Sequence, residues 1–177
     1  MPKSGFTLIE LLVVLSIMAV LGIFSIANFG DFGEGQKLKG AAFDIQSLIK
    51  TAQTNAASRI ACPVGSNTYG AHWWVEMQTG SQTLNLRCQI GTAGAISLIK
   101  TYTITTQSPN LQIFSVNCDT KVASGILSTA KFAPLTGAVS LDNEAACNQY
   151  LTITLKNIKT NETKLIKIDK GGAVSVK

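Results

Sequence analysis

The chain has 177 residues and a net charge of +5 at pH 7, with 46% hydrophobic and only 14% charged residues. This length corresponds to one domain, or to one domain with a tail. The few carboxylates are scattered, which argues against a carboxylate-pair hydrolase. The single histidine, His72, cannot complete an ordinary zinc site with distant thiols.

The apolar excess is concentrated in residues 6–29, which follow a short positive leader containing Lys3. As a helix, this segment of about 24 residues would measure about 36 Å, enough for a bilayer core of about 30 Å. It is too long for the apolar region of an ordinary secretory signal, and no A-x-A-like cleavage site follows it. Lys3 favours a cytoplasmic N-terminus. We therefore expect a membrane helix with the rest of the chain on the far side.

Glu10 is the one ionisable side chain within this segment. A carboxylate in a membrane helix is costly unless a partner offsets the charge. The residues alone leave two interpretations open. Glu10 lies near the headgroups, neutralised by protonation or water, or it pairs with the N-terminal amine of a neighbouring subunit.

Residues 3–14 read KSGFTLIELLVV, with Gly5, Phe6 and Glu10 in fixed relation to an uninterrupted apolar run. This pattern closely resembles the class III signal of type IV pilins and type II secretion pseudopilins. The resemblance implies cleavage between Gly5 and Phe6 by a prepilin peptidase, N-methylation of Phe6, and a role for Glu10 in subunit registration. It implies as partners other pilin or pseudopilin subunits, the peptidase, an inner-membrane assembly platform, and membrane lipid before assembly. The expected location is the cytoplasmic (inner) membrane, as a single-pass protein that joins a periplasmic or cell-surface filament.

Gly30, Gly33 and Gly35 follow the apolar run, and each costs a helix about 1 kcal/mol relative to alanine. A bend, a hinge or a simple linker would explain them, and we favour a weakened helical segment. Helical periodicity resumes at once over 36–59, with apolar residues at spacings of four and three. These are Leu38, Ala42, Ile45, Ile49, Ala52 and Ala56. The sequence thus predicts a leader (1–5), a transmembrane and assembly helix (6–29), a flexible joint with an amphipathic helix (30–60), and an extracytoplasmic β-rich domain (61–177).

Short β-like runs separated by turn residues follow. They span 69–77, 84–90, 96–105, 111–116, 126–132 and 138–141, then a hairpin formed by 151–155 and 164–168, and an edge strand over 173–176. Trp73 and Trp74 should point to opposite faces of the first strand, so we expect at most one in the core and the other exposed, as a subunit contact or a ligand platform. The predicted fold class is α+β: a pilin-like long N-terminal helix packed on a mostly antiparallel sheet.

The four cysteines are Cys62, Cys88, Cys118 and Cys147, with no CxxC pair. An even number outside the membrane suggests up to two disulfides. Three pairings are available, and we favour Cys62–Cys88 with Cys118–Cys147 because neighbours in sequence close the shorter loops. In a reducing compartment, the four would instead be small buried hydrophobes.

The stretch Tyr69-Gly70-x-His72-Trp73 and the run KFAPLTG at 131–137 are similar to H-type minor pseudopilins and related type IV minor pilins. This implies a structural minor subunit. The alternative is a pilus-associated subunit that binds extracellular DNA or a surface, with Lys164, Lys167 and Lys170 as candidate DNA contacts. The tail after Lys170 lacks arginine, unlike relatives that bind DNA, and these lysines are also typical of a solvated strand face.

No catalytic constellation is present: GxSxG, P-loop and HExxH motifs are absent. We expect His72 to be a packed or interfacial side chain and the acidic run at 142–144 to be a solvated hairpin tip. No enzyme activity, metal or cofactor is therefore expected.

Overall fold

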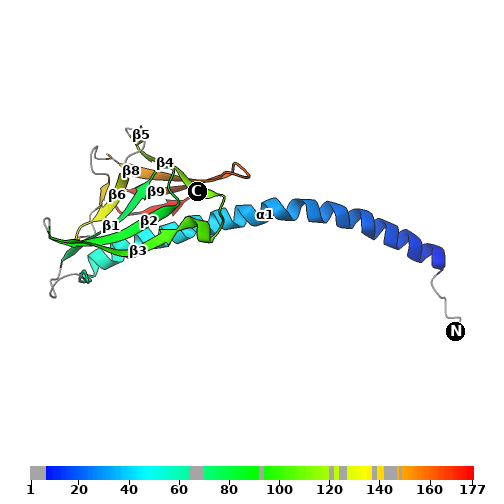
Figure 1. The fold of residues 1–177 in the computed structure, drawn as a ribbon, viewed down its shortest axis with the longest axis horizontal. Coiled ribbons are helices and arrows are strands. Elements are labelled where there is room, and N and C mark those ends of the chain that lie inside the picture. The colour runs from blue at the N-terminus through cyan, green and yellow to red at the C-terminus, as the bar shows by residue number, and fades with distance from the viewer. Residues whose placement is uncertain are drawn as a thin grey trace.

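The computed structural model describes residues 7–63, 70–91, 94–119, 122–123, 127–136, 139–141, 147 and 149–177. One long helix, α1 (Leu8–Ala57), extends from a β-domain whose sheets lie along one side of its C-terminal half (Figure 1). The strands are β1 (Ala71–Gln78), β2 (Thr83–Ile90), β3 (Ile96–Thr103), β4 (Leu111–Cys118), β5 (Val122–Ala123), β6 (Leu127–Phe132), β7 (Val139–Leu141), β8 (Tyr150–Asn157), β9 (Thr163–Asp169) and β10 (Val174–Val176). A short 3₁₀ helix, η1 (Ile104–Thr106), follows β3.

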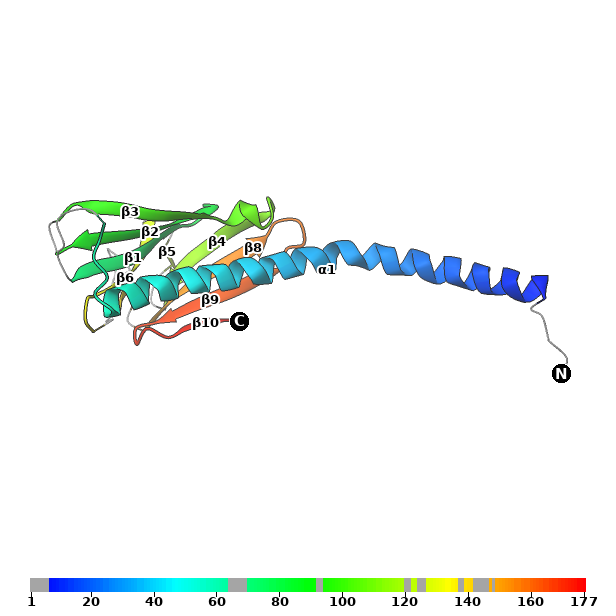
Figure 2. The same ribbon diagram turned by 90° about the horizontal axis from the view of Figure 1, so that it is seen from below.

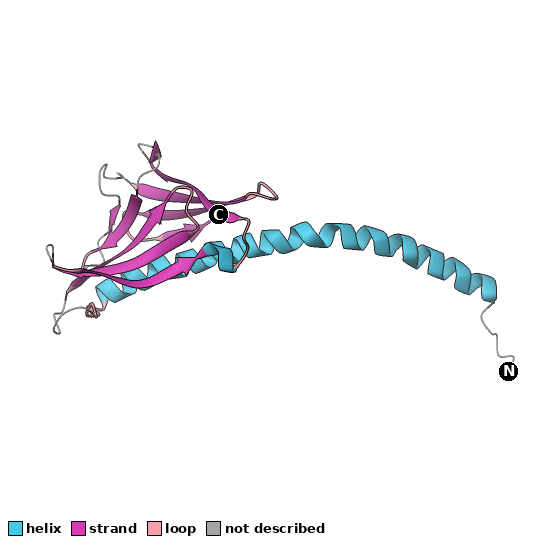
Figure 3. Cartoon of the chain, viewed as in Figure 1, coloured by secondary structure: helices cyan, strands magenta, loops and turns pink. Residues whose placement is uncertain are grey.

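The strands form two antiparallel sheets, ordered β3-β2-β1-β6-β7 and β10-β9-β8-β4-β5. The turn after β1 joins them, since Gly80 donates to Ile113 O at 2.7 Å and Ile113 donates to Ser81 O at 3.0 Å. α1 packs against β1 and β6 of the first sheet and against β8, β9 and β10 of the second. Figure 2 shows α1 running along both sheets, with β3 to one side and β10 to the other. The α+β class and the antiparallel sheets expected from the sequence are therefore present, as Figure 3 makes plain.

The expected amphipathic helix is the C-terminal half of α1. Ile45, Ile49 and Ala52 are fully buried against the sheets. The helix is continuous across Gly30, Gly33 and Gly35, where the sequence predicted a weakened segment, and it follows a gentle curve (Figure 1). A Cβ at Gly35 would lie 3.1 Å from Oε2 of the exposed Glu162 side chain, which would have to shift slightly.

Each predicted run contains a strand, with ends that differ by a few residues, whereas the two-residue strand β5 was not predicted. The largest departure follows Thr103, where the expected strand gives way to η1. The predicted C-terminal hairpin is β8 paired with β9, and β10 is the edge strand beside it.

The prediction for the tryptophans is wrong in one respect, because both Trp73 and Trp74 are buried. Trp73 belongs to the core between helix and sheets. Trp74 lies on the other face, where its Nε1 donates to Glu76 Oε1 at 3.1 Å and Lys131 Nζ lies 5.3 Å from its ring centroid. Arg87, directly across from Trp74 on β2, forms a 2.6 Å salt bridge with Glu76. The alternation of side chains along the strand predicted that one indole would be exposed to solvent. Long charged side chains instead cover the indole of Trp74.

Two disulfides join Cys62 to Cys88 and Cys118 to Cys147, the pairing that loop length favoured. The first ties the segment after α1 to β2, and the second ties the end of β4 to Cys147. Each closes a loop of fewer than thirty residues, with sequence separations of 26 and 29.

Candidate assembly surface

The first part of α1 stands clear of the β-domain (Figure 1). Every residue from 8 to 22 is exposed. The large apolar side chains there are Leu8, Ile9, Leu11, Leu12, Val13, Val14, Leu15, Ile17, Met18, Val20 and Leu21. They occupy all sides of the helix, and a helix that is apolar all round is normally buried in a large assembly or in lipid.

A crossing of the membrane requires a helix of sufficient length and apolar character. Among the residues that the structure describes, no helix meets both requirements.

Glu10 lies at the start of this exposed surface and closes a capping box with Thr7. Its Oε2 accepts from the Thr7 backbone N at 3.1 Å and from Thr7 Oγ1 at 2.9 Å, while Glu10 N donates to Thr7 Oγ1 at 3.4 Å. The carboxylate is therefore turned towards the N-terminus of its own helix. Glu10 was identified from the sequence but this contact was missed, although T-x-x-E is the sequence signature of a capping box. Gly5 and Phe6 lie outside the described residues.

Glu34 marks the point where α1 enters the β-domain. Its Oε2 accepts from Ser108 Oγ at 2.9 Å and from Asn157 Nδ2 at 2.9 Å, and its Oε1 accepts from Lys37 Nζ at 2.9 Å. The residue is only 8% exposed. Asn157 Oδ1 in turn accepts from the backbone N of Lys159 at 2.9 Å. One carboxylate thus fastens α1 to the segment before β4 and to the β8–β9 turn.

This arrangement favours the ionised carboxylate, because all three partners of Glu34 donate hydrogen bonds to it. The pKa of the Glu34 carboxyl falls from its ordinary value of 4.5 to about 2, chiefly through the hydrogen bond from Lys37 and then through those from Asn157 and Ser108. Sequence reasoning missed Glu34 because it stands among the glycines. Its spacing could have indicated burial, because Glu34 lies one helical turn before Leu38 and therefore on the same buried face.

The candidate DNA contacts do not form one surface. Lys164 is directly across from Leu155, whereas Lys167 is across from Thr152, on the opposite face of β9. Lys167 is occupied by a 3.0 Å salt bridge to Asp169 and lies 4.1 Å from the centroid of the Tyr150 ring. Lys170 is exposed in the turn after β9.

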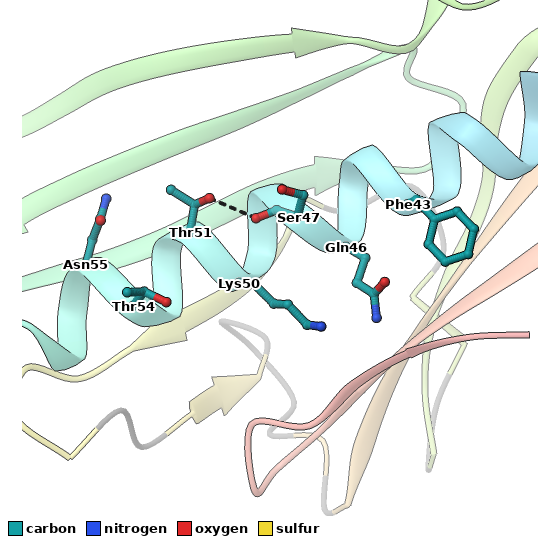
Figure 4. A pocket seen from close by; sticks show the side chains of 7 residues that line it. All are labelled: Phe43, Gln46, Ser47, Lys50, Thr51, Thr54 and Asn55. Atoms are coloured by element: carbon teal, nitrogen blue, oxygen red, sulfur yellow. Dashed lines mark hydrogen bonds between the residues drawn. The ribbon is translucent and has the colours of Figure 1, made fainter.

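A groove of about 470 Å³ runs along the outward face of α1. Figure 4 shows that its lining comes from the helix alone: Phe43, Gln46, Ser47, Lys50, Thr51, Thr54 and Asn55. The side chain of Lys50 is the one ionisable group among these lining residues, and Thr51 Oγ1 is engaged with Ser47 O at 2.8 Å. The groove therefore offers no acid–base or nucleophilic pair.

Within the described part of the chain, no three histidine, cysteine or carboxylate side chains come together as a metal site would require. His72 is half-buried on β1, and burial together with nearby Lys131 lowers its pKa. The acidic run at 142–144 lies outside the described residues.

Comparison with known proteins identifies the N-terminal segment. Residues 1–26 match the prokaryotic N-terminal methylation motif, the class III prepilin signal of type IV pilins and pseudopilins. No curated protein and no solved structure matches the chain significantly.

Proposed function

We propose that this chain is a minor structural subunit of a type II secretion pseudopilus or a type IV pilus. The observation that carries the proposal is the methylation motif at residues 1–26, within which residues 8–22 form a helix that is exposed and apolar on all sides. The motif supports a pilin-like or pseudopilin-like subunit, processed by a prepilin peptidase and assembled with other such subunits.

Before assembly, residues 6–29 anchor the subunit in the cytoplasmic membrane. A helix of this length measures about 36 Å and matches the bilayer core. The peptidase cleaves after Gly5, whose missing side chain leaves the scissile bond unhindered, and the new Phe6 amine is methylated. The β-domain, with its two disulfides, then lies in the oxidising space beyond the membrane.

During assembly, the apolar surface of residues 8–22 moves from lipid to neighbouring helices. Little hydrophobic energy is gained in this transfer, so close packing and polar contacts must direct it. Glu10 supplies the polar contact: its carboxylate already accepts hydrogen bonds from Thr7 at the helix N-terminus. Pairing with a neighbour's amine would fix the axial register of the two subunits.

Separate measurements of processing and assembly test this proposal. We expect Glu10→Val to be cleaved like the wild type but to be absent from the sheared filament fraction. Gly5→Val should remain at full length in the membrane. Ser16→Ala, on the same exposed helix, is the matched control and should be both cleaved and assembled. A Glu10→Val subunit that enters filaments as the wild type does would contradict the role assigned to Glu10.

A further inference from the structure

The end of the β-domain that faces the exposed part of α1 carries a distinctive set of side chains. We call it the basal surface and define it by Phe32, Lys39, Ile158, Lys159 and Lys164. The tip of the β8–β9 hairpin, which contains Ile158 and Lys159, points along α1 towards its N-terminus (Figure 1).

The contacts of Glu34 fix the position of this surface. The bond from Asn157 to Glu34 holds the β8–β9 turn beside the helix, directly after the exposed Phe32. Lys39 and Lys164 line one cleft of about 270 Å³, between α1 and β9, together with Gly35, Leu38, Glu162 and Thr163. The basal surface therefore combines residues of a helix, a turn and a strand.

Its composition is basic and apolar. Phe32 and Ile158 are 66% and 52% exposed. In the described part of the molecule, none of Lys39, Lys159 and Lys164 forms a salt bridge. The carboxylate of Glu34 is already occupied by its three donors, which leaves Glu162 as the acidic group of the cleft. Exposed aromatic and aliphatic groups beside lysines are typical of a surface that lies at the lipid–water interface.

The height of the surface above the bilayer follows from the proposed anchor. If residue 29 ends the apolar span, Glu34 lies about 8 Å beyond the hydrocarbon at 1.5 Å per residue. The headgroup layer of each leaflet is about 5–8 Å thick. Lys39, ten residues beyond position 29, would then lie about 15 Å beyond the hydrocarbon, which places it about one Debye length (~8 Å at physiological salt) from the outer edge of the headgroup layer.

We propose that the basal surface binds the anionic phospholipid headgroups of the membrane that holds α1, and so sets the orientation of the β-domain before assembly. This inference rests on the proposed function, because it requires residues 6–29 to be inserted. We call the β-domain docked when its basal surface contacts the headgroups. Each lysine near an anionic membrane strengthens binding by a factor of about five, so three lysines should raise the ratio of docked to undocked protein about 100-fold.

The test uses the full-length chain in vesicles, with a fluorophore on a new cysteine. All four native cysteines are in disulfides, so Thr163→Cys provides a unique thiol in the basal cleft. Thr54→Cys, exposed about 30 Å farther along α1, is the matched control position. Vesicles contain phosphatidylcholine alone or with phosphatidylglycerol, together with a quencher attached to the headgroups.

We expect quenching at position 163, but not at position 54, in vesicles with phosphatidylglycerol, and we expect high salt to reverse it. Combined Lys39→Gln, Lys159→Gln and Lys164→Gln should lower the docked ratio about 100-fold. Combined Lys50→Gln, Lys100→Gln and Lys170→Gln removes the same charge elsewhere and should leave it unchanged.

Each of the following results would overturn the inference. Equal quenching in both lipids, or equal effects of the two triple variants, would show that basal charge does not direct the domain. A response to DNA in detergent as large as the response to phosphatidylglycerol would identify a general polyanion site instead. Protein that an alkaline wash removes from the vesicles would overturn the membrane anchor as well, whereas retained protein with an unresponsive label would overturn only the headgroup contact.

Discussion

The two ends of α1 share one helical backbone but differ in what surrounds them. Residues 8–22 expose every side chain, whereas Ile45, Ile49 and Ala52 are completely buried against the two sheets. Glu34 stands at the boundary, bonded to both the helix and the β-domain. The C-terminal half is amphipathic, so its partner lies in the same chain. The N-terminal part has no polar face, so its partner must come from outside the subunit.

The largest effect should come from matched isoleucine truncations in the two regions. Ile49→Ala should lower the free energy of unfolding by about 2–5 kcal/mol, because it removes buried methyl groups and leaves a cavity. Ile17→Ala, at a residue that is 54% exposed, should change it by no more than about 0.5 kcal/mol. Urea unfolding of the full chain in detergent, followed by the fluorescence of the buried tryptophans, measures both. Equal losses of unfolding free energy in Ile49→Ala and Ile17→Ala would contradict the distinction between a buried and an exposed part of α1.

The disulfides belong to the β-domain side of the comparison. Replacing Cys62 and Cys88 together by alanine should cost about 3–4 kcal/mol, because the unfolded chain gains the freedom of the opened loop. Amide exchange should therefore increase throughout the β-domain. Exchange within residues 8–22 should stay as in the wild type, since no disulfide constrains them. A change confined to the loop between the two cysteines would contradict a global role.

The boundary residue should make stability depend on pH. Because the folded pKa of Glu34 is about 2 and its ordinary value is 4.5, its contribution is complete above pH 4.5 and disappears as pH falls towards 2. Glu34→Gln should therefore be less stable than the wild type at neutral pH, and the two should converge near pH 2. Thermal unfolding across this range provides the measurement. Glu162→Gln, at an exposed carboxylate beside the same helix, is the control and should keep the wild-type profile.

The smallest effect should come from the first turn of the exposed region. Thr7→Val removes the hydroxyl that caps α1, which should cost about 0.5–2 kcal/mol of local helix stability. Amide exchange at residues 8–10 should increase, while unfolding of the β-domain should be unchanged. Thr7→Ser keeps the hydroxyl and should restore protection. Protection that survives Thr7→Val would show that the capping box does not hold this turn.

Local patterns predicted most of the fold. The spacing of Leu38, Ile45 and Ile49 is sufficient to place a buried helical face, and alternation with turn residues located the strands. The pairing of cysteines agreed with the simple preference for short loops. The continuity of α1 across Gly30–Gly35 was harder to predict, because glycine has a low helix propensity. The contacts around these glycines, such as that of Gly35 with Glu162, depend on the tertiary fold.

The site was predictable only where it was local. Glu10 was identified from the N-terminal motif, but the contacts of Glu34 join residues 74 and 123 positions apart and have no short-range signal. The burial of Trp74 likewise depends on Arg87 and Lys131 from neighbouring strands. The sequence grouped Lys164 with Lys167 as candidate DNA contacts, and their separation of three residues places them on opposite faces of one strand.

Intact mass spectrometry of the protein purified from its native membrane tests the central claim most directly. The account predicts a chain that begins at N-methylated Phe6 and lacks four hydrogens, two for each disulfide. That mass would report processing, methylation and an oxidising compartment together. A chain that retains Met1, or one cut near the end of the apolar segment, would contradict assignment as a processed filament subunit.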